Sequence, residues 1–290
     1  MQKKTVGIVA ILIASILWAI EPIIAKLSYA TSTFITTAAV RALIVAAIGF
    51  LYAQITNKGN ITVLKKEGYT IIVIALVASI FSDLLYFYAL KTLPVVNVTL
   101  LSHLQPIFIV MIGYFILKED KLTTYDYIGI IIMIFSAFLV TTRNLTNLFS
   151  LKLGTVADLL IIMATIAWAL TTILARKYLS SVNAGVIIFY RFLIAGMLLT
   201  AYLFITHSIS PVNTYQIMLG FIIGIGMVLY YEGLKRLKAA QTSSLELSST
   251  FFAALLGFFI LGELVTIMQM VGILSLCIGV YFLSRKEYVP

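Results

Sequence analysis

The sequence carries very little charge for a chain of 290 residues. Only 11% of its residues are charged, whereas 62% are hydrophobic. A soluble domain has about 25% charged and about 45–50% apolar residues. The composition therefore excludes an ordinary soluble globular protein and indicates a chain that is solvated by lipid.

Residues that form disulfides or bind metals are nearly absent. Cys277 is the only cysteine, which excludes an internal disulfide and any multi-cysteine metal site. The two histidines, His103 and His207, are far apart in the sequence. The sequence contains no HExxH, GxSxG or Walker A pattern, which argues against an intramembrane enzyme and against ATP drive within this chain. We therefore expect no catalytic residue, no metal site and no cofactor.

Long apolar segments are what the chain does have. Ten of them are about 20 residues long, enough to cross roughly 30 Å of hydrocarbon as helices. Because lipid offers the backbone no hydrogen-bond partners, helices are the expected spanning structure. The sequence thus predicts an all-α integral membrane protein with ten transmembrane helices. Their approximate limits are 6–28, 34–55, 69–90, 95–117, 125–142, 154–175, 183–205, 213–234, 239–261 and 265–284.

The second half of the chain repeats the first. Residues 86–119 align with 230–263 at 11 of 34 positions, and residues 11–53 align with 161–203 at 11 of 43. Each half has five predicted helices, an odd number, so the second half enters the membrane upside down. We predict two inverted five-helix repeats, 1–145 and 153–290. Because the first apolar segment has an internal copy, we interpret it as a span and not as a signal peptide.

Basic residues are distributed unevenly between the predicted loops. If the N-terminus is cytoplasmic, fourteen Lys and Arg residues fall on the cytoplasmic side and four outside. The positive-inside rule then predicts cytoplasmic N- and C-termini in the cell membrane. The basic residues that give the net charge of +9 are accordingly expected to face the cytoplasm and anionic lipid headgroups, and not nucleic acid.

Acidic residues inside predicted spans are candidate functional residues, because a charge at the bilayer centre costs about 3 kcal/mol or more. Glu246 lies in a polar stretch of the ninth span, and it either lines a wet cavity as a substrate or proton site or joins an internal hydrogen-bonded cluster. Glu21 either binds a substrate ammonium beside Trp18 or pairs with a basic residue, Lys26 or Arg41. The proton-coupling candidates are Glu246, Glu21, Asp83 and Glu232, of which the last two are alternatively counter-ions for an arginine.

Arg41 and Arg191 occupy the same place in the second and seventh spans. Their symmetric recurrence favours a shared structural role, such as pairing with a carboxylate, over anion binding. Small residues such as Gly113, Gly257 and Gly279 are expected to permit close helix packing.

The fourth span combines polar side chains with a proline. Pro106 frees the carbonyl of Ser102, and such a break exposes backbone to a ligand in transporters. His103 is either a proton relay or simply paired with a neighbour. Aromatic residues in matching spans complete the expected cavity wall. The predicted substrate-binding residues are Trp18, Glu21, Tyr86, Ser102, His103, Gln105, Trp168, Tyr230, Glu246 and Ser249.

Several segments together resemble the EamA-type family of the drug/metabolite transporter superfamily, over nearly the whole chain. WAIEPIIAK at 18–26 and WALTTILARK at 168–177 open the halves, and the segments 105–129 and 251–272 close them. Thr250 stands where the family often has proline, whereas Pro106 keeps it. The resemblance implies uptake or export of small metabolites through a central cavity lined mainly by helices 1, 3, 4, 6, 8 and 9, with helices 5 and 10 peripheral.

The sequence therefore favours a secondary transporter for small organic metabolites, such as amino acids, that works by alternating access with proton coupling or by facilitated diffusion. A nucleotide-sugar or phosphorylated-metabolite exchanger is the alternative, and it requires several cations in the cavity. A passive channel fits the inverted layout poorly. The expected partners are the substrate and the lipid bilayer, with the protein a monomer or a homodimer.

Overall fold

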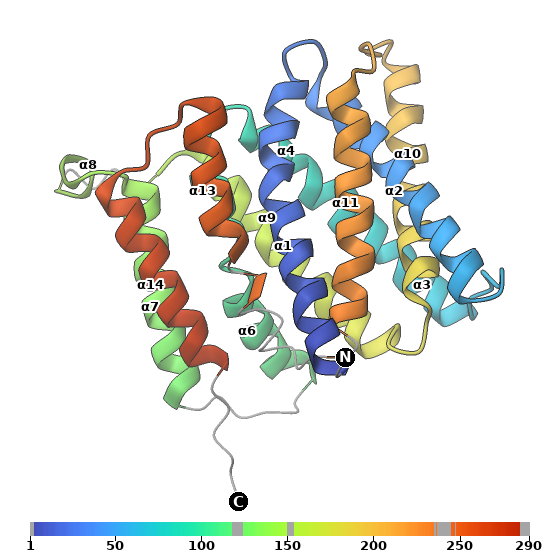
Figure 1. The fold of residues 1–290 in the computed structure, drawn as a ribbon, viewed down its shortest axis with the longest axis horizontal. Helices are drawn as coiled ribbons and strands as arrows, with labels where there is room; N and C mark the ends of the chain where they lie inside the picture. The colour runs from blue at the N-terminus through green and yellow to red at the C-terminus, as the bar shows by residue number, and fades with distance from the viewer. Residues whose placement is uncertain are drawn as a thin grey trace, which may run out of the picture.

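The computed structural model describes residues 3–117, 124–149, 154–234, 236, 245–246 and 248–284, and in these ranges every regular element is a helix (Figure 1). This confirms the predicted all-α class. The helices are α1 (Lys3–Ser28), α2 (Phe34–Thr56), α3 (Lys65–Ile74), the π-helix η1 (Ala75–Ser82), α4 (Asp83–Leu90), α5 (Val95–Ser102), α6 (Gln105–Leu117), α7 (Thr124–Thr142), α8 (Leu145–Phe149), α9 (Val156–Tyr178), α10 (Ala184–Ile205), α11 (Thr214–Leu234), α13 (Ser248–Leu261) and α14 (Ile267–Ser284).

Seven helical stretches in the described residues, 19 to 26 residues long, are long and apolar enough to cross a membrane. Three shorter apolar helices, Tyr127–Val140, Phe252–Leu261 and Ile267–Phe282, fall where further spans were predicted. The chain is therefore a multi-pass membrane protein. The seven stretches are Thr5–Ser28, Phe34–Thr56, Lys65–Leu90, Val95–Gly113, Val156–Ala175, Ala184–Ile205 and Thr214–Gly233.

Helices from the two ends of the chain lie side by side. α1 packs between α11 and α13, and α9 packs against α6 and against the continuous run formed by α3, η1 and α4. α2 lies along α10, whereas α7 and α14 form a separate pair at one edge of the bundle (Figure 1). The interior is thus built almost entirely from contacts between the first and second halves of the sequence.

The third and fourth spans are irregular at mid-length. Between α3 and α4 the chain widens into the π-helix η1, where the Ser82 hydroxyl donates to the carbonyl oxygen of Val77 at 2.8 Å. π-Helical turns are rare and often accompany functional sites, and nothing in the sequence indicated this one. The fourth span is interrupted between Ser102 and Gln105, directly before Pro106, as its proline suggested. Pro22, in contrast, lies inside α1 without ending it.

Glycine lets two helix pairs approach closely. A Cβ on Gly185 would lie 2.6 Å from the backbone nitrogen of Ala53, so the backbones of α2 and α10 touch there. A Cβ on Gly279 of α14 would lie 2.5 Å from Met133 Cγ on α7, which agrees with the expected close packing. Gly113 and Gly257 leave more room, because the nearest described atoms would be 3.9 and 3.4 Å from a Cβ at these positions.

Candidate functional site

A buried charge cluster joins the first three spans. Arg41 of α2 donates through Nη1 to Glu21 Oε1 of α1 at 3.0 Å and through Nη2 to Asp83 Oδ2 of α4. The side chains of Arg41 and Asp83 are each 6% exposed, and that of Glu21 is 16% exposed. Two carboxylates and one guanidinium therefore share one site, with a formal charge of −1 when all three are ionised. Of the two basic partners considered for Glu21, the structure selects Arg41.

Aromatic rings enclose this cluster. The indole Nε1 of Trp168 on α9 donates to Asp83 Oδ1 at 3.1 Å, so the second half of the chain also contributes to the site. The guanidinium carbon of Arg41 lies 4.7 Å from the ring centroid of Phe87 and 5.8 Å from that of Phe192. Cation–π contacts of this kind stabilise a desolvated cation. The aromatic surroundings thus offset part of the cost of burying Arg41.

The predicted aromatic residues meet in two pairs. The ring centroids of Trp18 and Tyr230 are 5.0 Å apart between α1 and α11. Those of Trp168 and Tyr86 are 5.6 Å apart between α9 and α4. The two tryptophans are repeat equivalents, and so are the two tyrosines, so each pair takes its members from opposite halves. The rings therefore lie where helices of the two halves meet.

In the described part of the chain, Arg191 and Glu232 form no ion pair with the cluster, although Arg191 shares the Phe192 ring with Arg41. Arg191 donates through Nε to Ser79 Oγ of η1 at 2.7 Å, and its guanidinium carbon is 4.8 Å from the Phe192 ring centroid. No carboxylate pairs with Arg191 among the described residues, in contrast to Arg41. Glu232 accepts a hydrogen bond from the Tyr52 hydroxyl at 2.6 Å and forms an ion pair with Arg236 one turn later.

Polar residues of the interrupted fourth span reach across to the other half. His103 Nδ1 lies 2.7 Å from the carbonyl oxygen of Thr99, and its Nε2 lies 2.7 Å from Ser249 Oγ of α13. The Ser249 hydroxyl lies within hydrogen-bond distance, 2.7 Å, of the Glu246 carbonyl oxygen as well. His103 is thus paired on both nitrogens, and it connects two spans at the level of the helix break.

The amide of Gln105 makes a second link between the halves. Its Nε2 donates to Thr172 Oγ1 of α9 at 3.1 Å. Ser102, in contrast, donates within its own helix to the Thr99 carbonyl oxygen at 2.8 Å. Gln105 therefore joins the interior contacts between repeats, whereas Ser102 contributes to the local geometry of the break.

Glu246 is partly buried, and no other described residue forms a hydrogen bond or ion pair with its carboxylate. The polar stretch that accompanies it in the sequence, residues 241–244, lies outside the described residues. Glu246 therefore differs from Glu21 and Asp83, which are both held by an arginine.

One ion pair was not expected from the sequence. Lys26 Nζ, in the last turn of α1, lies 2.5 Å from Glu263 Oε1 in the connection between α13 and α14. Glu263 Oε2 accepts the backbone N–H of Val95 at 2.6 Å, at the start of α5. Glu263 therefore connects the end of α1, the start of α5 and the segment after α13. The alternative in which Lys26 pairs with Glu21 is wrong.

A second unexpected cluster surrounds Asp158, whose Oδ2 lies 3.7 Å from Arg143 Nη2. Asn97 of α5 donates to the Val140 carbonyl oxygen at 3.2 Å and to Asp158 Oδ1 at 3.3 Å, and it accepts from Gln269 Nε2 at 2.5 Å. Asp158 and Gln269 each close a capping interaction with the threonine three residues earlier, Thr155 and Thr266. The spacing T-x-x-D or T-x-x-Q is visible in the sequence and predicts a helix start. The contacts of Asp158 and Gln269 with Asn97 are not visible in the sequence.

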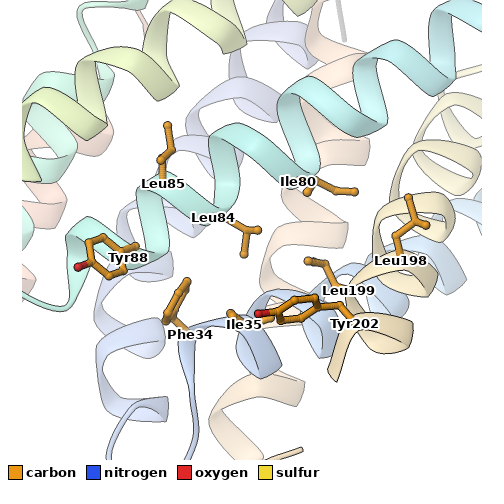
Figure 2. A pocket seen from close by; sticks show the side chains of 9 residues that line it. All are labelled: Phe34, Ile35, Ile80, Leu84, Leu85, Tyr88, Leu198, Leu199 and Tyr202. Carbon is orange, nitrogen blue, oxygen red and sulfur yellow. The ribbon is translucent and has the colours of Figure 1, made fainter. Parts of the chain in front are cut away.

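The apolar crevice in Figure 2 is separate from all of these residues. It has a volume of about 410 Å³ and lies between α2, the run from η1 to α4, and α10. Tyr88 is 49% exposed and Tyr202 is 51% exposed, so the crevice opens on the outer surface of the bundle. None of the predicted substrate-binding residues lines it. Its lining residues are Phe34, Ile35, Ile80, Leu84, Leu85, Tyr88, Leu198, Leu199 and Tyr202.

The interior holds carboxylates, an imidazole and aromatic rings, and the part of the chain that the structure describes holds no group of three metal-ligating side chains. The arrangement offers acceptors for ammonium groups and protons and hydrogen-bond donors for a polar solute.

Known proteins support a transport role. The sequence model of the EamA-like transporter family matches residues 5–142 and 155–285. An uncharacterised transporter of Methanothermobacter thermautotrophicus is 25% identical over 300 residues, covering 97% of this chain and 87% of the relative. The uncharacterised transporter YyaM of Bacillus subtilis is 23% identical, covering 88% of this chain and 86% of its own length.

The fold also has a counterpart among solved structures. One protein crystal structure superposes with a TM-score of 0.68 and 15% identity, covering 96% of both chains. At that identity the likeness concerns the fold alone. The family and the names of the relatives indicate a transporter and not an enzyme. Since the family model matches most of the sequence, the chain belongs to the EamA-like transporter family.

Proposed function

We propose that the protein is a secondary transporter that carries small organic metabolites bearing an ammonium group, such as amino acids, by alternating access coupled to protons. The observation that carries this proposal is the cluster of Glu21, Arg41 and Asp83. One guanidinium cannot neutralise two carboxylates, so a buried site of this composition favours uptake of one proton or of a cationic group.

The substrate class follows from the sign of the interior charges. Glu21 lies one turn from Trp18, whose ring contacts that of Tyr230 at a tilted angle, so a carboxylate and an aromatic side chain are available together. This combination suits a substrate ammonium. A nucleotide sugar would need several cations without a counter-ion, but Arg41 is held by two carboxylates, which leaves Arg191 alone of the two arginines in the predicted spans. The structure therefore gives no support to the exchanger of phosphorylated metabolites.

Alternating access requires two related halves, and we infer that residues 1–145 and 153–290 are inverted repeats of five spans each. Three observations support this. The family model matches two segments of similar length. The contacts between helices are also symmetric. The first helix of the first half, α1, packs on α11 and α13 of the second half, and the first helix of the second half, α9, packs on the equivalent third span and α6 of the first half. The tryptophan–tyrosine pairs follow the same exchange.

The start of α1 and the end of α14 lie at the same end of the bundle (Figure 1). This arrangement agrees with an even number of crossings, as the proposed ten spans require. Together with the excess of basic residues in the loops at that end, it supports cytoplasmic termini in the cell membrane.

The test is uptake of labelled solutes into proteoliposomes across a panel of amino acids, amines and phosphorylated metabolites, with and without a pH gradient. Asp83→Asn and Glu246→Gln would be compared with Glu67→Gln, a control at the start of α3 whose carboxylate accepts only the Leu64 backbone N–H. We expect saturable, gradient-driven flux of an ammonium-bearing solute that is lost in Asp83→Asn and kept in Glu67→Gln. Flux of a phosphorylated solute alone would refute the substrate class. Gradient-driven flux that survives both Asp83→Asn and Glu246→Gln would refute proton coupling at these carboxylates.

A further inference from the structure

A basic hollow lies on the surface where α3 begins and α9 ends. It has a volume of about 500 Å³ and is lined by Lys65, Lys66, Tyr69, Thr70 and Tyr178. The two helices pack against each other at this point. The hollow is remote from the charge cluster and shares no residue with it, so the proposed transport function leaves it unexplained.

Lys65 and Lys66 line the hollow, and Lys177 lies beside it against the ring of Tyr178. The ammonium nitrogens of Lys66 and Lys177 lie 5.0 and 5.4 Å from the ring centroid of Tyr178, so they are at most about 10 Å apart. That is no more than a Debye length at about 0.1 M salt, and the two charges therefore repel each other. No carboxylate lies within ion-pair distance of Lys65, Lys66 or Lys177 among the described residues.

The acidic residue nearest in sequence does not relieve this repulsion. Glu67 turns its carboxylate to the backbone N–H of Leu64 at 2.8 Å, where it caps the start of α3. An anion placed between the lysines would relieve the repulsion, and the tyrosine ring would hold the ammonium groups in position around it.

The position of the hollow relative to the membrane indicates the source of that anion. Lys65 begins the helical stretch Lys65–Leu90 that is long enough to cross the membrane, so the hollow lies at the boundary between hydrocarbon and water. Directly below it, Tyr69, Ile72 and Leu76 form an exposed apolar stripe along the same helix. A phosphate in the hollow would thus have a surface for acyl chains immediately beside it.

We propose that this hollow binds the phosphate of an anionic membrane phospholipid, with the acyl chains lying along the Tyr69–Ile72–Leu76 stripe. Clusters of lysine at the ends of spans attract anionic lipid, and each lysine contributes about fivefold in affinity. The hollow adds geometry to this general attraction, since two ammonium groups converge on one ring. The lipid belongs to the leaflet at the end of the bundle where α1 begins (Figure 1).

The test uses the full chain in detergent micelles, with phosphatidylglycerol and phosphatidylcholine as probes and native mass spectrometry to count bound lipid. Lys66→Gln/Lys177→Gln would be compared with Lys58→Gln/Lys91→Gln, which removes the same net charge from exposed lysines elsewhere. We expect selective retention of phosphatidylglycerol by the unmodified protein, about 30-fold weaker in the first variant and nearly unchanged in the second. Lys66→Arg/Lys177→Arg keeps the charge and should keep the lipid.

Three results would overturn the proposal. Equal losses in both glutamine variants would mean that net charge alone attracts the lipid. Equal retention of phosphatidylcholine by the unmodified protein would mean that the headgroup charge is not recognised. Displacement of the lipid by millimolar inorganic phosphate would assign the hollow to a soluble anion. If Lys66→Gln/Lys177→Gln does not fold, loss of lipid from a folded Lys66→Arg/Lys177→Arg protein would still count against the proposal.

Discussion

Replacement of Arg41 by methionine should destabilise the protein more than the replacement of any other single arginine described above. Methionine has a similar volume and packs against Phe87 and Phe192, so the main loss is the guanidinium charge. Glu21 and Asp83 would then face each other in the interior with no positive partner. Removing one member of a buried ion pair costs about 3–5 kcal/mol, because the remaining charge stays buried. Arg41 partners two carboxylates, so we expect the upper part of that range.

The reasoning predicts a specific rescue. In Glu21→Gln/Arg41→Met/Asp83→Asn, no charge remains to be buried, and replacing a whole buried ion cluster with neutral groups is often neutral or stabilising. We therefore expect the triple variant to recover most of the lost free energy of unfolding while it remains unable to couple transport to protons.

The assay is reversible unfolding by SDS titration, with Arg236→Met as the control. Arg236 forms an i,i+4 pair with Glu232 and is 34% exposed, so its loss should cost only about 0.3–0.5 kcal/mol. A stability loss for Arg41→Met as small as that of the control would refute the idea that the cluster is buried and paired. A triple variant no more stable than Arg41→Met would show that the arginine acts through its shape or hydrogen bonds and not by neutralising the carboxylates.

Three further substitutions test separate parts of the structure. Gly185→Ala should destabilise the protein by about 1–3 kcal/mol, since its Cβ would meet backbone atoms of α2, whereas Gly113→Ala should be neutral or slightly stabilising. Thermal melts followed by circular dichroism would compare the two variants, and equal effects would contradict the close crossing of α2 and α10. Asn97→Ala should cost about 1–3 kcal/mol in SDS unfolding because it leaves the buried Gln269 amide without its acceptor, and an unchanged stability would argue against the Asn97 network. Glu263→Ala should cost more than Lys26→Met in the same titration, because it also removes the acceptor of the Val95 N–H; the reverse order would contradict the role of Glu263 in joining three spans.

The sequence predicted the parts of the structure that depend on composition and periodicity. Lipid solvation requires helices, so the apolar runs located the helical stretches, and Pro106 located the break between α5 and α6. The repeat also aligned Trp18 with Trp168 and Tyr86 with Tyr230, the four residues that form the two aromatic pairs. It did not reveal that each tryptophan pairs with the tyrosine of the other half.

Pairing between distant residues is what the sequence could not supply. Arg41 and Arg191 are equivalent in the alignment, yet Arg41 meets Glu21 and Asp83 whereas Arg191 meets Ser79. The repeat places Thr171 and Met227 where the first half has Glu21 and Asp83, so the second half offers Arg191 no matching carboxylates. The sequence did not show that Glu21 and Asp83 both meet Arg41. Likewise, the sequence suggested only Glu21 as a partner for Lys26, whereas the arrangement of α1 against α13 brings Lys26 to Glu263.

The order of synthesis gives the packing of α1 a consequence for how the protein is assembled. α1 leaves the ribosome first, but its main neighbours, α11 and α13, begin about 200 residues later. At about 5–20 residues per second, α1 waits roughly 10–40 s in the bilayer before they arrive. Glu21 need not remain unpaired during that wait, because Arg41 follows in the very next helix and can neutralise it as soon as α2 is inserted. The early pairing would let the first hairpin stay in the membrane until the last helices close the interior around it.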